Sequence, residues 1–318
     1  MSEPISAEGL CQIDPEIGAF VDSINAGYAK FSPDGEMTIA ERRAVAERVR
    51  EPWRSGGPVM AETRNFELNG LRMRLHRPSN ESTLAAMLYI HGGGWALFSV
   101  DTHDRLMREY AQRAGIAVIG IDYSLAPEAK FPVALNEIVA AVEALRAQAD
   151  GLGVDSARMA IGGDSAGANL TVAACLKMRD IGVAPVQAMV LNYGVYAPEH
   201  KPSYLRFGEP PHCLTADEMD AFWHDYVDDS SQLSNTLVAP LHAQLHDLPP
   251  AFLAIAECDI LADCNHELAQ KLSAAGNAVE AIEYKGATHS FLEAMSVAAL
   301  ARKALDDQAA WLRKVLAQ

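Results

Sequence analysis

A serine flanked by glycines is the residue whose setting points most directly to chemistry. The segment Gly-Asp-Ser-Ala-Gly at residues 163–167 follows an apolar run at 159–161 and precedes a helical pattern at 168–178. This G-x-S-x-G spacing is typical of a nucleophilic serine on a sharp turn between a strand and a helix. Both glycines are needed because the turn presses backbone against backbone. We therefore expect Ser165 to be a nucleophile, with the first amides of the helix facing its oxygen.

A serine hydroxyl needs a base to accept its proton, and two downstream residues are placed to supply it. For a serine on such a turn, an acid and then a histidine are expected later in the chain, each on a loop after a strand. Asp259 and His289 occupy such loops. We expect His289 to take the proton from Ser165 and later to protonate the leaving group. Asp259 would fix the tautomer of the imidazole and stabilise its protonated form.

Two other acids compete for the role of Asp259, because Glu257 and Asp263 lie close to it in the sequence. Asp263 is also suited to the N-terminus of a helix, and Glu257 is placed either behind the site or on the surface. Asp259 is the preferred assignment. His289 is one of ten histidines, and a histidine is more often a surface or core residue. Its position on the loop after the last strand selects it.

Three consecutive glycines follow an early apolar run and are suited to bind an oxyanion. The pattern of a buried strand at 85–90 leads directly into His-Gly-Gly-Gly-Trp at 91–95. Glycines let backbone amides approach a ligand without obstruction by side chains. We expect the amides of Gly93 and Gly94, with that of Ala166, to form an oxyanion hole. The alternative, a flexible linker, is disfavoured because the strand runs straight into the glycines.

The elements that must position these residues follow a regular alternation. Strand patterns at 85–90, 117–121, 159–161, 188–191, 251–256 and 279–284 alternate with helical patterns at 133–148, 168–178, 266–275 and about 297–316. Such alternation predicts an α/β fold with a mostly parallel central sheet flanked by helices and with its sites at the carboxyl ends of the strands. An antiparallel hairpin is predicted at 64–77, around Asn69-Gly70.

Two segments interrupt this pattern and are predicted to form a helical cap. Residues 1–60 carry two helical patterns, at 16–28 and 38–49, and precede a main domain at 61–318. Residues from about 197 to 236 contain four prolines and a helical pattern at 216–228. The alternative for this insertion is a packing excursion without substrate contact. Aromatic residues near these loops are candidates either for the wall of a substrate pocket or for plain core: Trp95, Phe98, Tyr196, Phe207, Phe222, Trp223 and Phe291.

The overall composition excludes several classes of partner. A formal net charge of −16 over 318 residues disfavours nucleic acids and anionic membrane surfaces, because both select basic patches. The first residues lack a basic start and an apolar core, and no apolar run is long enough to cross a membrane, so a cytoplasmic location is expected. A homodimer is a reasonable expectation for a soluble protein.

The five cysteines, Cys11, Cys175, Cys213, Cys258 and Cys264, are odd in number and lack the spacing of a zinc site. We expect free thiols in a reducing compartment. Cys258 and Cys264 flank Asp259, but no chemistry is assigned to them. Neither a metal nor an organic cofactor is expected.

Taken together, the motifs resemble those of the hormone-sensitive-lipase-like esterases of the α/β-hydrolase fold. The resemblance spans roughly residue 84 to the C-terminus. It includes His-Gly-Gly-Gly-Trp at 91–95, Asp-Thr-His-Asp at 101–104, Tyr-Ser-Leu-Ala-Pro-Glu at 123–128, Phe-Pro at 131–132 and the serine motif with Asn-Leu at 169–170. Departures are Asp-Ile-Leu-Ala-Asp-Cys at 259–264, Gly-Ala-Thr-His-Ser-Phe at 286–291, and Ala168 where a glycine is usual. Asp259 and His289 keep their positions.

The resemblance implies a cofactor-free serine carboxylesterase that forms an acyl-enzyme on Ser165 and acts on small esters with acetyl to hexanoyl chains. It also implies a cap made by N-terminal helices and an insertion. One alternative is a ligand-binding protein on the same fold. Receptors of that kind lack the catalytic histidine, so His289 argues against it. A hydrolase of amides, thioesters or acetylated natural products would share every residue named. Nucleophilic-aspartate chemistry is disfavoured because the turn carries a serine.

Overall fold

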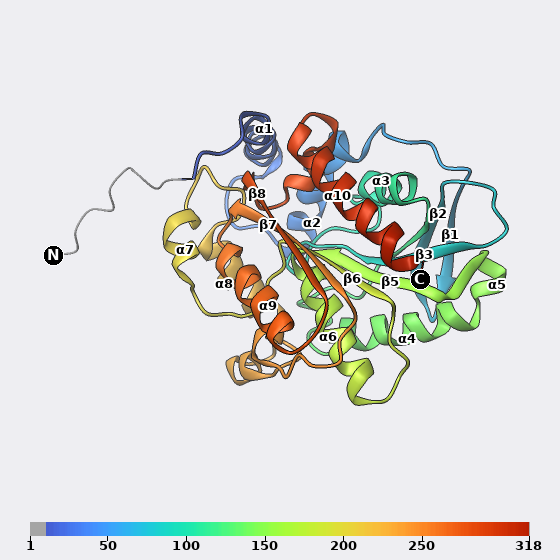
Figure 1. Cartoon of the computed structure of the whole chain (residues 1–318). Coiled ribbons are helices and arrows are strands. Elements are labelled where there is room, and N and C mark those ends of the chain that lie inside the picture. The colour runs from blue at the N-terminus through green and yellow to red at the C-terminus, as the bar shows by residue number, and fades with distance from the viewer. Residues whose placement is uncertain (1–10, 318) are drawn as a thin grey trace.

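One eight-stranded sheet forms the centre of the computed structural model, which describes residues 11–317. The strand order is β1-β2-β4-β3-β5-β6-β7-β8 (Figure 1). The strands are β1 (Glu62–Leu68), β2 (Leu71–Arg77), β3 (Leu84–Ile90), β4 (Ala117–Ile121), β5 (Val154–Asp164), β6 (Ala188–Asn192), β7 (Ala251–Cys258) and β8 (Val279–Thr288). From β4 to β8 every neighbouring pair is parallel, whereas β2 is antiparallel to both β1 and β4. The predicted mostly parallel sheet is confirmed.

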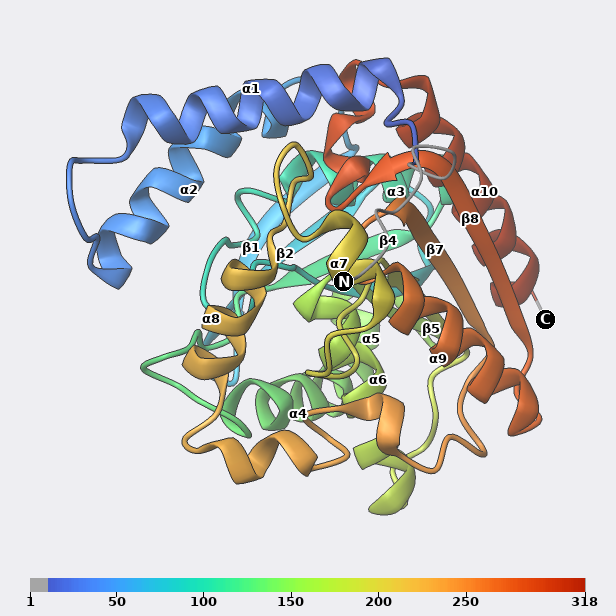
Figure 2. The same ribbon diagram turned by 90° about the vertical axis from the view of Figure 1, so that its left-hand side faces the viewer.

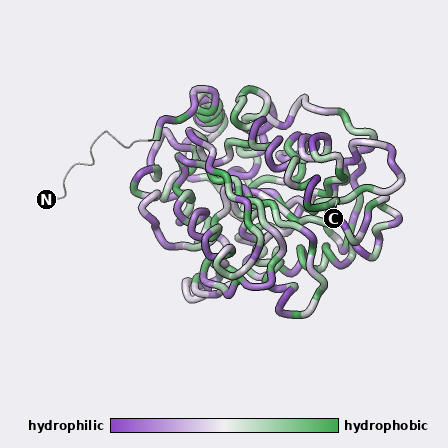
Figure 3. Tube along the Cα trace, in the orientation of Figure 1, coloured by the Kyte–Doolittle hydropathy of each residue, from purple (hydrophilic) through white to green (hydrophobic). Residues whose placement is uncertain are grey.

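Helices cover both faces of this sheet. On one face lie α3 (Asp104–Ala114) and α10 (Ala299–Leu316); on the other lie α4 (Val133–Ala147), α6 (Ala166–Asp180) and α9 (Ala262–Ala274), and the short α5 (Ala149–Leu152) leads into β5 (Figure 1). Alternate side chains of β3 explain the two layers, since Met87 and Tyr89 join one hydrophobic core and Leu88 and Ile90 join the other. Figure 3 shows the hydrophobic segments gathered along the central strands.

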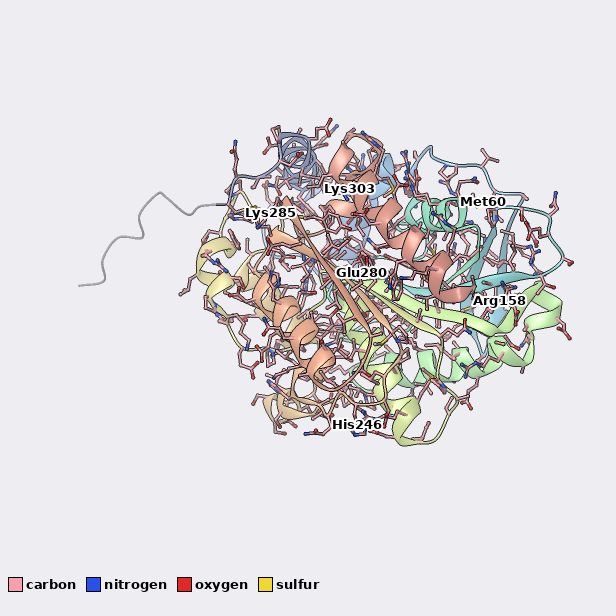
Figure 4. All side chains as sticks on the ribbon, in the orientation of Figure 1. Met60, Arg158, His246, Glu280, Lys285 and Lys303 are labelled. Carbon is pink, nitrogen blue, oxygen red and sulfur yellow. A yellow bond between two sulfur atoms is a disulfide. The ribbon has the colours of Figure 1, made fainter. Side chains whose placement is uncertain are left out.

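The register of the strands brings the predicted site loops to one edge of the sheet. Ile90 pairs with Gly163, Asp164 with Asn192, and Cys258 with Thr288. The glycine loop, the serine and the two later loops therefore leave the sheet side by side. In Figure 4, Lys285, close to the end of β8, lies at this edge. Arg158, in the first half of β5, lies at the opposite side of the molecule.

Strand lengths differ from the sequence prediction at both edges of the sheet. β5 begins at Val154, five residues before the predicted start at 159. The pattern missed this part of the strand because residues 155–158 are polar or exposed and do not resemble a buried strand. β8 runs on to Thr288 through Lys285 and Gly286, which the sequence pattern places outside the strand. This extension delivers His289 directly from the sheet. The predicted hairpin is present, with Asn69 and Gly70 at φ 53° and 80° between β1 and β2.

Two groups of helices lie over the carboxyl edge (Figure 2). The first is α1 (Pro15–Phe31) with α2 (Ile39–Arg54), which begin at side-chain caps from Asp14 and Thr38. The second lies between β6 and β7 and comprises α7 (Pro202–Phe207), α8 (Ala216–Tyr226) and the 3₁₀ turns η1 (Ser230–Ser234) and η2 (Pro240–His242). A third 3₁₀ turn, η3 (Phe291–Ser296), follows His289. The amide of Asp14 donates to the carbonyl of Gly286 over 2.9 Å, which attaches the start of α1 to β8.

The expectation of five free thiols is wrong for two of them, because a disulfide joins Cys11 to Cys258. The sequence separation of 247 residues concealed this pair. The backbone contact between Asp14 and Gly286 brings the segment before α1 to the ends of β7 and β8, where Cys258 lies. Cys175 and Cys264 are free and buried, and Cys213 is free and partly buried.

Within residues 11–317, no helix combines the length and the apolar character required to cross a membrane. The predicted absence of a basic, apolar leader concerns residues that lie outside the described part of the chain.

Candidate active site

Ser165 lies between the last residue of β5 and the first of α6, in a backbone conformation that few residues adopt. Its φ is 52° and its ψ is −118°, which for a residue other than glycine costs on the order of 1–3 kcal/mol. The neighbouring glycines make this turn possible, because a β-carbon on Gly163 or Gly167 would collide with the carbonyl oxygen of Ile90. The amide of Ser165 donates to Asn192 at the end of β6 over 2.9 Å. The turn therefore points the serine side chain out of the sheet edge.

A continuous row of hydrogen bonds joins Ser165 to His289 and Asp259. His289 Nε2 lies 2.9 Å from Ser165 Oγ, and His289 Nδ1 lies 2.8 Å from Asp259 Oδ2. The other carboxylate oxygen of Asp259 accepts from the amide of Leu261 over 3.0 Å, which fixes the acid against the start of α9. All three functional side chains are buried. This geometry allows a proton to pass from the hydroxyl to the imidazole.

The charge of Asp259 controls the protonation of His289. Burial lowers the pKa of His289, but the charge of Asp259 and its hydrogen bond raise it by more, so the pKa lies above the usual histidine value. The competing acids serve other partners. Glu257 accepts from the amide of Gly286 over 2.8 Å, and Asp263 accepts from the amide of Ser203 over 2.8 Å. Neither carboxylate is hydrogen-bonded to His289.

The glycine loop presents its amides beside the serine. Gly93 and Gly94 have φ of 102° and 58°, and both line the same cavity as Ser165 and His289. A β-carbon on Gly94 would collide with the ring of Phe222 from α8. Within residues 11–317, neither glycine amide donates to a protein acceptor. Ala166 is the first residue of α6, so its amide also lacks an intrahelical partner.

Asp164, to which the sequence analysis gave no role, connects the glycine loop to the serine turn. Its buried carboxylate accepts from the hydroxyl of Tyr89 over 2.8 Å and from the amide of Gly92 over 3.1 Å, and it lies 3.3 Å from His103 Nε2. Burial raises the pKa of Asp164, but the charge and hydrogen bond of His103 outweigh it and lower the pKa overall. The sequence signal that could have indicated this role is the presence of an acid between Gly163 and Ser165, at the end of a buried strand.

Replacement of Asp164 by asparagine is expected to lower the free energy of unfolding by roughly 3 kcal/mol at neutral pH, because it leaves the buried His103 without its charged partner. The folded-state pKa of Asp164 lies below the unfolded value, so its stabilisation is present above the unfolded pKa and is lost as pH falls through the lowered one. Urea unfolding at several pH values checks both points. A difference between the two proteins that grew toward acid pH would contradict this role.

A cavity of about 420 Å³ lies over Ser165 and His289. Its size is typical of a site for a small molecule. Its walls come from both helical groups, through residues such as Tyr28 and Arg50 on α1 and α2 and Met219 and Phe222 on α8. The N-terminal helices therefore take part in the site although they are far from it in sequence.

The predicted aromatic residues divide between this cavity and the core. Phe98 and Phe222 line the cavity. The others are buried away from it and belong to the core alternative: Trp95, Tyr196, Phe207, Trp223 and Phe291. Trp95 stacks on Tyr226 at 4.2 Å, and Phe291 packs against the ring of Tyr193 at 5.7 Å. These contacts keep both rings in the core, a consequence of tertiary packing that spacing along the chain does not encode.

One group of possible metal ligands is close enough to share an ion within residues 11–317. It consists of Cys11, Glu257 and Cys258. The two sulfurs are bonded to each other, so neither offers the thiolate that a metal would require. The group does not fit a metal site.

A parallel sheet with a strained serine between strand and helix, and with an acid and a histidine on later loops, defines the class of the α/β-hydrolases. A sequence profile described as alpha/beta hydrolase fold matches residues 87–293. The chain belongs to the hormone-sensitive-lipase-like family of this fold.

Individual relatives are similar over nearly the whole chain. Acetyl esterases of Salmonella agona (strain SL483) and Salmonella typhi are each 33% identical over 307 residues, which cover 94% of this chain and 94% of theirs. An ester-hydrolase from the metagenome of Lake Arreo has a TM-score of 0.90 and 31% identity, over 96% of this chain and 100% of that one. A hyperthermophilic esterase from Pyrobaculum calidifontis has a TM-score of 0.88 and 29% identity, over 95% and 98%.

Proposed function

We propose that this protein is a serine carboxylesterase that hydrolyses esters of short to medium acyl chains. The observation that carries the proposal is the hydrogen-bonded row from Ser165 through His289 to Asp259 at the floor of a cavity. The acetyl esterases and ester-hydrolases among its relatives support the same reaction.

The proposed reaction has two halves. Ser165 Oγ attacks the ester carbonyl while His289 Nε2 takes its proton, and the developing oxyanion is stabilised by the amides of Gly93, Gly94 and Ala166. His289 then protonates the leaving alcohol, which gives an acyl-enzyme. Water, activated by the same imidazole, attacks this ester and releases the acid, and the proton returns to the serine. Asp259, hydrogen-bonded to His289 Nδ1, stabilises the imidazolium.

The cap is part of this proposal. We assign it to α1 and α2 together with the insertion at about 197–236, because residues of both groups line the cavity around Ser165. Such walls exclude water and strengthen the electrostatic interactions inside the site. A cavity of about 420 Å³ favours a small ester over a bulky long-chain fat.

The proposal is tested with p-nitrophenyl esters from acetate to dodecanoate, assayed beside a p-nitroanilide and a thioester of the best acyl group. We expect the highest kcat/KM between the acetyl and hexanoyl esters and at least tenfold lower values for dodecanoate and for the anilide. Absence of turnover on every ester would overturn the proposal. A higher rate on the anilide or the thioester would show that the preferred substrate is an amide or a thioester, with Ser165 still the nucleophile.

The acid limb of the pH profile is a separate prediction. His289 must be neutral to accept the proton, and Asp259 raises the pKa of His289. We therefore expect kcat/KM for p-nitrophenyl acetate to rise with pH, with a midpoint above the usual histidine pKa of about 6.5. Replacement of Asp259 by asparagine removes that charge and is expected to move the midpoint to lower pH. A midpoint that did not move in the variant would contradict the pairing.

Two further predictions concern the setting of the enzyme. The homodimer stays a prediction, which sedimentation or size-exclusion chromatography would check. The cytoplasmic location also stays a prediction, and the Cys11–Cys258 bridge counts against it, because disulfides persist mainly in oxidising compartments.

A further inference from the structure

A buried arginine lies in the wall of the substrate cavity and takes no part in the proposed reaction. Arg50, on α2, is only 4% exposed, yet it lines the same cavity as Ser165. Its Nε donates to Glu293 over 3.0 Å, and its Nη1 donates to the hydroxyl of Tyr28 over 3.2 Å. The guanidinium also packs over the ring of Phe98 at 4.8 Å. These contacts hold the side chain in one place.

Arg50 and Tyr28 both have hydrogen-bond donors that remain unused among residues 11–317. Arg50 Nη2 makes no hydrogen bond there, and it is not one of the buried atoms sealed from solvent. Tyr28 accepts from Arg50 through its oxygen, so its own hydroxyl hydrogen is available as well. Burial raises the pKa of Tyr28, which therefore keeps this proton at neutral pH. Both residues face the cavity and form a fork of donors.

The charges around the fork indicate what it would accept. Glu293 neutralises Arg50 within the buried pair, and a second acid, Glu218, lines the cavity. A carboxylate at the fork would be repelled by these two acids, whereas an uncharged oxygen would gain the hydrogen bonds without that cost. The wall near α1 and α2 also contains the apolar Ile24 and Met37 together with the polar Asn25. The other cation in this wall, Arg42, is already paired with Asp225 over 3.2 Å. The surroundings therefore favour an uncharged polar atom on a partly apolar group.

We propose that Arg50 and Tyr28 form a subsite for an uncharged acceptor oxygen, a ketone, ether or hydroxyl, on the part of the substrate remote from the reacting carbonyl. The preferred substrates are then oxygenated esters and not simple alkyl ones. This inference rests on the proposed esterase function, because it places the fork and Ser165 in contact with one ligand in one cavity.

The experiment compares substrates that differ in one group. On the acyl side, p-nitrophenyl hexanoate is compared with the 5-oxohexanoate, which adds the acceptor, and with the glutarate monoester, which replaces the terminal methyl ketone by a carboxylate. On the alcohol side, hexyl acetate is compared with 5-oxohexyl acetate. We expect kcat/KM to be about tenfold higher for the oxo member of at least one pair, since a hydrogen bond to a charged donor is worth about one such factor. The glutarate ester is expected to be the poorest acyl substrate.

Two variants test the fork. The first is Tyr28→Phe. The second is the double variant Arg50→Met with Glu293→Gln, which removes both charges of the buried pair. Tyr28→Phe is expected to reduce the oxo preference about threefold and the double variant to abolish it, mostly through KM, where the preference is the ratio of kcat/KM for the oxo and the plain ester measured on the same variant. Tyr284→Phe, whose hydroxyl contacts Asp307 away from the cavity, is the control and is expected to keep the preference.

The outcomes separate the two proposals. Rapid hydrolysis of hexanoate with no oxo preference in either pair would overturn the subsite and leave the esterase intact. If no ester were hydrolysed, calorimetric binding of methyl 5-oxohexanoate and methyl hexanoate to Ser165→Ala would still test the fork, and equal affinities would refute it. A preference that survived both the Tyr28 variant and the double variant would also refute it.

Discussion

Replacement of Ser165 by alanine is expected to lower kcat for p-nitrophenyl butyrate by roughly five to six orders of magnitude. The hydroxyl is the atom that forms the acyl-enzyme in the proposed reaction, and its loss leaves the imidazole without a hydroxyl nucleophile to activate. Alanine keeps the backbone of the turn at the same φ, and the buried side chain shrinks by one atom. The fold should therefore persist, and a urea denaturation curve close to that of the parent would show it.

Ser156→Ala is the matched control for this variant. Ser156 lies on the same strand, β5, but at its exposed amino half, away from the cavity. Its replacement is expected to change kcat by less than about twofold, since exposed positions away from such features have small effects. If Ser165→Ala kept a substantial fraction of the parent rate, after exclusion of contaminating esterase, the nucleophile would have to be assigned elsewhere.

Asp259→Asn is expected to lower kcat by about four orders of magnitude while the fold stays intact. Asp259 Oδ2 lies 2.8 Å from His289 Nδ1, where a carboxylate accepts the ring proton and leaves Nε2 free as a base. An asparagine nitrogen at this position would donate instead, and it would favour the tautomer that carries the proton on Nε2. That tautomer cannot take the proton of Ser165.

The two nearby acids provide controls for this variant within the same loop region. Asp263→Asn and Glu257→Gln are expected to keep activity within about tenfold of the parent, because their carboxylates bind the amides of Ser203 and Gly286 and not the imidazole. Equal losses in Asp259→Asn and Asp263→Asn would show that the acid had been misassigned. The rates of the three variants therefore identify which acid is the partner of His289, a choice that the sequence left open.

The sequence supports the parts of this site that depend on local signals. The glycines at 163 and 167 mark the turn because no β-carbon fits against Ile90, and the apolar runs mark the strands that meet at the carboxyl edge. The order of the chemistry-bearing loops then follows from the parallel sheet. Strand ends were harder to locate, since Lys285 and Gly286 interrupt the pattern of β8 just before His289.

The parts that the sequence did not reveal all depend on contacts between distant segments. Arg50 and Tyr28 belong to helices that carry no motif, and only packing against η3 and the glycine loop brings them to the cavity. The Cys11–Cys258 bridge depends on the attachment of α1 to β8. Conversely, Trp95 and Phe291 sit next to motif residues yet turn into the core. Sequence spacing shows which residues are neighbours along the chain. The shape of the pocket depends instead on which faces of the folded helices line it.

Covalent labelling by a fluorophosphonate tests the central claim most directly, because the reagent requires an activated serine next to a working oxyanion site. We expect one adduct per chain, located by peptide mass spectrometry on Ser165, formed at a rate that parallels the loss of ester hydrolysis and strongly slowed in His289→Ala. An enzyme that hydrolysed esters at full rate while Ser165 stayed unlabelled, or whose adduct mapped to another residue, would contradict the account.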